Sequence, residues 1–114
     1  MVWLRALNAT LAFAIELCML GAFADWGFHV SENQVLRWLI ALGATGAAIA
    51  LWALWGAPKS STRLAPPWLY MFEWGMFACA AAALYATGRP RLALTFIVIA
   101  SANVALWVGL DRSA

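Results

Sequence analysis

Two carboxylates stand inside apolar stretches of the chain, where they could exchange protons or bind a solute. Glu16 lies within TLAFAIELCML (residues 10–20), and Glu73 lies within YMFEWGMF (residues 70–77). A carboxylate in hydrocarbon costs roughly 2.5–3.5 kcal/mol on insertion scales, so it faces the interior of a helix bundle and finds partners there. These two residues are therefore the first candidates for a binding or proton-linked site.

Three further polar side chains are candidates for the same site. Asn8 and Asn103 are amides within apolar segments, and Lys59 stands where another apolar segment ends. Because a helix rises about 1.5 Å per residue, all five residues fall in the half of the membrane nearer the chain termini or at its middle. We expect Lys59 to pair with Glu73, and the deeper Glu16 to be protonated or hydrogen-bonded to an amide or hydroxyl.

The composition around these candidates is typical of a membrane protein. The chain has 114 residues, of which 66% are hydrophobic and 11% are charged, whereas roughly a quarter of the residues in a soluble domain are charged. A soluble fold of this size could not bury so much apolar side chain. The net charge of +2 comes from scattered Lys and Arg, which argues against a nucleic-acid surface and fits the flanks of membrane helices.

Four apolar segments are long enough to cross a bilayer, which takes about 20 helical residues. Because lipid offers backbone groups no hydrogen bonds, we expect helices rather than strands. The predicted fold is an all-α integral membrane four-helix bundle that forms a single domain over residues 1–114, with short loops and both termini on one side. We expect the first segment to stay as a mature helix, because Glu16 interrupts what would otherwise resemble a signal peptide. The expected helices are residues 5–24, 35–56, 68–87 and 92–110.

Local signals set the expected helix ends. Ser31, followed three residues later by Gln34, is typical of a capping box at the start of the second helix. Pro58 cannot continue that helix. Gly88 suits a left-handed C-terminal cap, and Pro90 suits the first turn of the last helix. So short a link predicts an antiparallel hairpin of the third and fourth helices.

Small residues recur at four-residue spacing in the second and third segments. Such residues let helix backbones approach closely in membranes, so we expect these two helices in the bundle interior. Most of the eight tryptophans fall near one membrane face or the other and predict an aromatic belt. Trp52 and Trp74 lie about one turn deeper, where they could line a pocket or simply pack. The small residues are Gly43 and Ala47, then Gly75, Cys79 and Ala83.

Lysine and arginine predict the orientation of the chain. The positive-inside rule counts only these two residue types, and four against three predict that both termini are cytoplasmic. The four on the terminal side are Arg5, Lys59, Arg63 and Arg112, and the three on the other side are Arg37, Arg89 and Arg91.

The chemistry-bearing residues do not match the common catalytic patterns. His29 is the single histidine, so a bis-histidine haem within this chain is excluded. The sequence has no HExxH, GxSxG or P-loop motif. Hydroxyls at residues 60–62 have no histidine base placed near them. We therefore expect no enzyme, no cofactor and no metal site.

Several of these stretches resemble the YrdB-like family of small four-helix bacterial membrane proteins. The resemblance rests on LAFAIEL around Glu16, DWGFH after the first helix and LWALWGAPKS at the end of the second, together with Asn8, Glu73 and Asn103. The function of that family is not established, so the resemblance implies the fold, the bacterial inner membrane and the same polar residues. The layout is also similar to that of the small multidrug-resistance exporters, which have four helices and one essential carboxylate in the first.

Three functions stay open at this point. The first is a polar site for a small solute or a proton, built from Asn8, Glu16, Trp52, Lys59, Glu73 and Asn103. The second is a proton-coupled exporter of hydrophobic cations, as a homodimer because four helices enclose little volume. The third is a scaffold or subunit of a larger membrane complex, in which buried polar groups only fix helix register.

Overall fold

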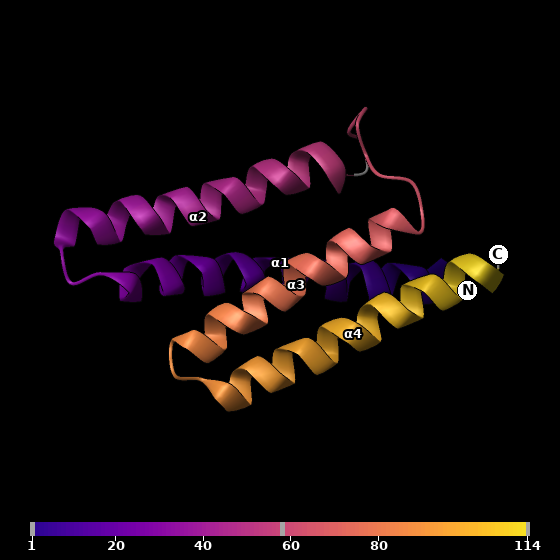
Figure 1. The fold of residues 1–114 in the computed structure, drawn as a ribbon. Coiled ribbons are helices and arrows are strands. Elements are labelled where there is room, and N and C mark those ends of the chain that lie inside the picture. Colours follow the sequence, from indigo (N-terminus) through magenta and orange to yellow (C-terminus); the bar gives the residue numbers. More distant parts are fainter. Residues whose placement is uncertain (1, 58, 114) are drawn as a thin grey trace.

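The protein is described by a computed structural model that covers residues 2–57 and 59–113. These residues form four α-helices: α1 (Val2–Val30), α2 (Gln34–Trp55), α3 (Trp68–Ala86) and α4 (Pro90–Ser113), shown in Figure 1. Each helix is long and apolar enough to cross a membrane. The predicted all-α, four-helix architecture is confirmed, and the chain is a multi-pass membrane protein.

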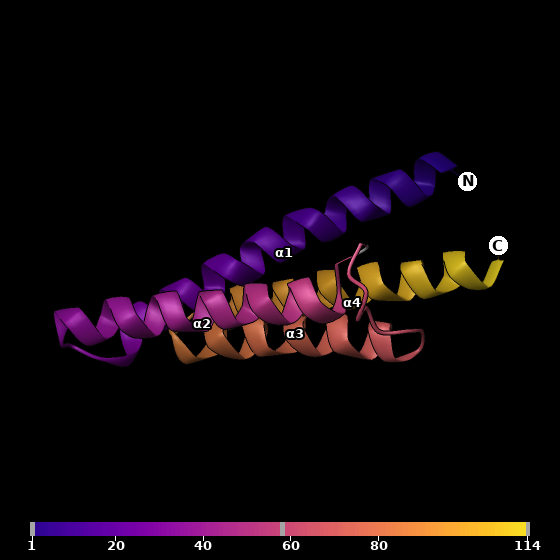
Figure 2. The same ribbon diagram turned by 90° about the horizontal axis from the view of Figure 1, so that it is seen from above.

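The two ends of the chain lie together at one end of the bundle, as Figures 1 and 2 both show. The guanidinium of Arg5, near the start of α1, lies 2.8 Å from a carboxylate oxygen of Asp111, near the end of α4. At the opposite end, α3 and α4 form the predicted antiparallel hairpin. Its turn contains Gly88 with a φ of +81°, a left-handed conformation that glycine adopts without steric cost, and α4 begins at Pro90 as expected.

Two predicted helix boundaries are wrong. The first helix continues past Asp25 to Val30, because Asp25 has partners of its own at that end of the bundle. The N-cap of α2 is Asn33 rather than Ser31: its side-chain oxygen accepts hydrogen bonds from the backbone of Val35 at 2.9 Å and Leu36 at 3.3 Å. The prediction on Pro58 lies outside the described residues, although α2 does end just before it, at Trp55.

The core of the bundle is built around α3. Its side chains Leu69, Phe77 and Ala80 are almost completely buried, and Ala100 of α4 and Met19 of α1 pack into the same core. The prediction that the third helix is interior is therefore confirmed.

The second helix is peripheral, contrary to the prediction. It packs mainly on α1, and its buried residues within the described chain are Ala41 and Ala48. The two helices approach each other closely near the α1–α2 turn, where a Cβ atom on Gly27 would fall only 2.3 Å from the Cα of Ala41. Beyond this crossing, small residues of α2 and α3 face each other across an apolar hollow of about 600 Å³ instead of touching; they include Ala47, Gly75, Cys79 and Ala83.

Candidate functional site

A pocket of about 410 Å³ opens in the half of the bundle nearer the chain termini. Small-molecule sites commonly have volumes of roughly 300–1,000 Å³. All four helices and the loop after α2 contribute to its wall. Five of the six predicted site residues line it: Asn8, Glu16, Trp52, Glu73 and Asn103.

The two carboxylates of the pocket differ in their surroundings. Glu73 on α3 is buried, with 9% of its surface exposed, whereas Glu16 on α1 is only partly buried. The indole of Trp52 lies beside the Glu16 carboxylate, and the two carboxylates share the pocket wall, close enough for their charges to repel. The expected buried cluster of carboxylates is therefore not found within the described residues. Instead, the buried carboxylate of Glu73 and the half-buried carboxylate of Glu16 stand on the wall of an open pocket.

The two amides of the pocket bind each other. The side-chain NH₂ group of Asn103 donates to the backbone oxygen of Asn8 at 3.0 Å and to its side-chain oxygen at 2.8 Å. The NH₂ group of Asn8 donates in return to the backbone oxygen of Asn103 at 3.3 Å. Both residues are buried. This pair fixes α1 against α4 and closes one side of the pocket.

The predicted pairing of Lys59 with Glu73 is wrong. Lys59 is exposed, lies outside the described lining of the pocket and forms no ion pair within the described chain. The cation that reaches the pocket is Arg63, whose Nε donates to the backbone oxygen of Gly56 at 3.2 Å.

The loop after α2 explains why Arg63, rather than Lys59, reaches the pocket. The hydroxyls of Ser60 and Thr62 both donate to the backbone oxygen of Leu54, at 2.6 and 2.5 Å. These bonds satisfy a carbonyl that the end of α2 leaves without a helical partner. They fold the loop back over α2, which points Arg63 at the pocket.

A second polar network stands at the edge of the pocket and was missed by the sequence analysis. Arg5 donates to a carboxylate oxygen of Asp111 at 2.8 Å and to the backbone oxygen of Leu110 at 2.6 Å. The hydroxyl of Tyr70 donates to the other oxygen of Asp111 at 2.5 Å, and its ring packs edge-on against Trp107. The signal that could have revealed it was an arginine and an aspartate at the outer ends of the first and last helices, on one membrane side.

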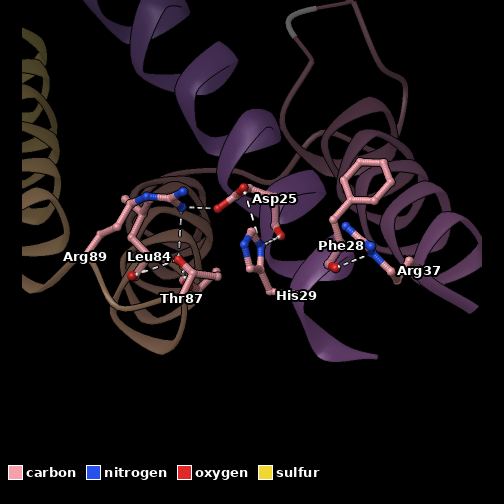
Figure 3. A network of polar contacts seen from close by, with 8 residues as sticks. Asp25, Phe28, His29, Arg37, Leu84, Thr87 and Arg89 are labelled. Atoms are coloured by element: carbon pink, nitrogen blue, oxygen red, sulfur yellow. Dashed lines mark hydrogen bonds and ion pairs between the residues drawn. The ribbon is translucent and has the colours of Figure 1, made fainter. Parts of the chain in front are cut away.

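The opposite end of the bundle is held by a separate network, shown in Figure 3. The carboxylate of Asp25 pairs with Arg89, and the Nδ1–H of His29 donates to the backbone oxygen of Asp25 at 2.7 Å. Arg37 at the start of α2 donates to the backbone oxygen of Phe28 at 2.8 Å. Since α1 is thus bonded at both ends, these contacts orient the pocket walls without lining the pocket.

Comparison with known proteins places the chain in a family. A family profile described as "Protein of unknown function (DUF2568)" matches residues 10–101. The chain belongs to this family. No curated protein matches the chain, and no solved structure matches it. The part matched by DUF2568 includes Glu16, Trp52 and Glu73 of the pocket.

The pocket of this DUF2568 protein combines acceptors, aromatic rings and apolar surface. Glu16 and Glu73 offer carboxylate oxygens, while Trp52 and Trp107 offer ring faces or edges. Much of the remaining wall consists of alanine, phenylalanine, valine and leucine side chains. Such a wall can hold a small molecule by its apolar body and orient it through a few polar groups.

Gly56 leaves the space that the Glu73 carboxylate occupies in this DUF2568 chain. A Cβ atom at residue 56 would lie 3.0 Å from Cδ1 of Trp52 and 3.2 Å from Oε1 of Glu73. Both side chains would have to move by a few tenths of an ångström, so we expect Gly56→Ala to lower the free energy of unfolding by about 1 kcal/mol. Titration with SDS in mixed micelles measures this change. Gly46→Ala is the matched control on α2, because nothing lies within 4 Å of its added methyl group; equal stability of the two variants would contradict the predicted crowding.

Proposed function

We propose that this protein binds a small solute in the pocket, with Glu73 as the principal polar contact and Glu16 beside it. The observation that carries the proposal is the placement of Glu73. Its carboxylate is buried in a membrane-spanning helix, forms no ion pair within the described residues and borders a pocket of solute size. A charged group in that position is costly unless something neutralises it, and either a solute or a proton can do so.

A purely structural role accounts less well for this arrangement. Polar residues that only fix helix register bond to each other, as Asn8 and Asn103 do. Glu73 instead borders open space. We propose binding rather than catalysis, because the described lining places no hydroxyl, thiol or imidazole beside its two carboxylates.

Charged groups from several elements stand around the pocket that these carboxylates line. Arg5 lies on α1, Arg63 in the loop after α2, and Asp111 near the end of α4, where it holds Arg5. Protons and solute compete for the same carboxylates, so we propose that binding responds to pH. We further propose a YrdB-like protein of the bacterial inner membrane with both termini in the cytoplasm, supported by the sequence resemblance and the lysine and arginine count.

Thermal unfolding of the detergent-purified protein against a panel of solutes tests this function. We expect at least one solute to raise the melting temperature by a different amount at pH 5.5 than at pH 8, because protonation removes the negative charge of Glu73. Glu73→Gln is expected to abolish the effect, whereas Glu32→Gln, which changes an exposed carboxylate between α1 and α2, is expected to keep it. If solutes stabilise Glu73→Gln as they stabilise the wild type, Glu73 is not the contact and the proposal fails.

A proton-coupled exporter is the second candidate, favoured by one observation. The second helix, which carries Trp52 of the pocket, packs mainly on α1 and has few contacts with α3 and α4, so it can move relative to those two helices with little loss of contact. Flux of the bound solute into reconstituted vesicles, driven by a pH gradient, would show transport. Binding without flux would indicate a binding protein that acts alone, as a homodimer or as a subunit of a larger complex.

A further inference from the structure

We propose that the solute is an organic cation, namely a protonated amine on an apolar body. This inference rests on the proposed function and specifies its ligand class. It is supported by the balance of charge around the pocket, by the hydrogen bonds that Arg5 and Arg63 already form, and by the apolar and aromatic wall.

The charged groups that line the pocket are two carboxylates and two guanidinium groups, and one of these guanidinium groups, that of Arg5, is paired with Asp111 beside the lining. The two carboxylates are Glu16 and Glu73, and a third, Asp111, holds Arg5 at the edge of the pocket. Against these three stand the two guanidinium groups of Arg5 and Arg63. With all five groups ionised, one negative charge remains, and a monovalent cation neutralises it.

The two arginines are already engaged by other groups. The two terminal nitrogens of Arg5 donate to Asp111 and to the backbone oxygen of Leu110. Nε of Arg63 donates to the backbone oxygen of Gly56, and the residue is exposed on its loop. An anion entering the pocket would face two carboxylates and would find Arg5 already paired with Asp111, which favours a cation over an anion.

The rest of the wall favours an organic cation over a metal ion. No group of three His, Cys, Asp or Glu side chains is arranged to hold a metal among the described residues. Apolar groups of Ala12, Phe77 and Val104 share the pocket with the indoles of Trp52 and Trp107. Such a wall receives an apolar body, and an indole attracts a nearby cation.

The geometry gives each part of such a ligand a place. An ammonium group donates hydrogen bonds to the Glu73 carboxylate, and charge-assisted bonds of this kind are the stronger ones. Glu16 lies with Trp52 on the same pocket wall, so a second carboxylate stands near the ammonium group. The apolar body then lies against the side chains contributed by α1 and α4.

Calorimetric titration at pH 8 with three probes of equal chain length tests the ligand class. The probes are hexylammonium, hexanol and hexanoate, added to the detergent-purified protein. We expect hexylammonium alone to bind at the pocket. Its dissociation constant should rise by about tenfold or more in Glu73→Gln and stay unchanged in Glu32→Gln, which controls for partitioning into the micelle. Glu16→Gln serves as the second variant if Glu73→Gln does not fold, with the same loss expected.

The outcomes separate the ligand class from the site. If hexanol or hexanoate binds as tightly as hexylammonium and also depends on Glu73, the cation class is overturned while the proposed function stands. The class is likewise overturned if none of the three binds but a neutral or anionic solute stabilises the protein through Glu73. If hexylammonium binds wild type, Glu73→Gln and Glu16→Gln equally, the cation site is refuted. If no solute of any class depends on either carboxylate, both proposals fail.

Discussion

Gly27→Ala is expected to separate α2 from α1 and to lower the free energy of unfolding by about 3 kcal/mol. The added Cβ would lie 2.3 Å from the Cα and 2.5 Å from the backbone nitrogen of Ala41. A backbone atom cannot rotate away as a side chain can, so the two helices must move apart. Overpacking in a close-packed core costs roughly 1–3 kcal/mol. The cost at Gly27 falls at the upper end of this range because α2 is held to the bundle mainly through α1.

Titration with SDS in mixed micelles measures the loss, and the chain supplies a matched control. Gly21→Ala changes the same helix in the same way, but nothing lies within 4 Å of the new methyl group. We expect that variant to match or exceed the wild type, since alanine is the better helix former by roughly 1 kcal/mol. Equal stability of the two variants would show that α1 and α2 do not meet at Gly27.

Removing the amide pair is expected to have the second largest effect on stability. Asn8→Leu or Asn103→Leu alone leaves the other buried amide without its partner, which costs roughly 1–3 kcal/mol. The double variant replaces both amides with apolar groups of similar volume, so we expect it to recover part of the loss. The coupling energy of the double-mutant cycle should be about 1–2 kcal/mol, near the upper end for hydrogen bonds between membrane helices.

The same SDS titration gives the four free energies of this cycle. A matched cycle on Asn8 and Thr95 is the control, because the hydroxyl of Thr95 bonds within its own helix, to the backbone oxygen of Arg91. We expect that cycle to be additive. Additivity in the Asn8–Asn103 cycle as well would mean that the amides do not hold α1 to α4.

The sequence was sufficient to predict the number, order and approximate bounds of the helices. Length and hydropathy determine how many segments cross a bilayer, and Gly88 with Pro90 determines the tight turn between α3 and α4. Depth along each helix also follows from counting residues, because the rise per residue is fixed. Counting therefore predicts that Glu16, Glu73 and Asn103 lie in the same half of the membrane, and in the structure all three line a single pocket.

What the sequence did not predict depends on contacts between elements. The extension of α1 beyond Asp25 relies on Arg89, which lies 64 residues away. The choice of Arg63 over Lys59 follows from the loop folding back onto Leu54, which a residue count cannot reveal. The outer position of α2 follows from the contact of Gly27 on α1 with the backbone of Ala41 on α2. The spacing of small residues alone had predicted an interior helix.

The bonds that close the bundle also set the order in which it can be completed during synthesis. Arg5 and Asn8 enter the membrane with the first helix, but their partners Asp111 and Asn103 follow 106 and 95 residues later. Until α4 is inserted, the amide of Asn8 has no partner from that helix, and the pocket has no fourth wall. A nascent chain of three helices therefore exposes the polar groups of the pocket on one side. Insertion of the last helix covers them.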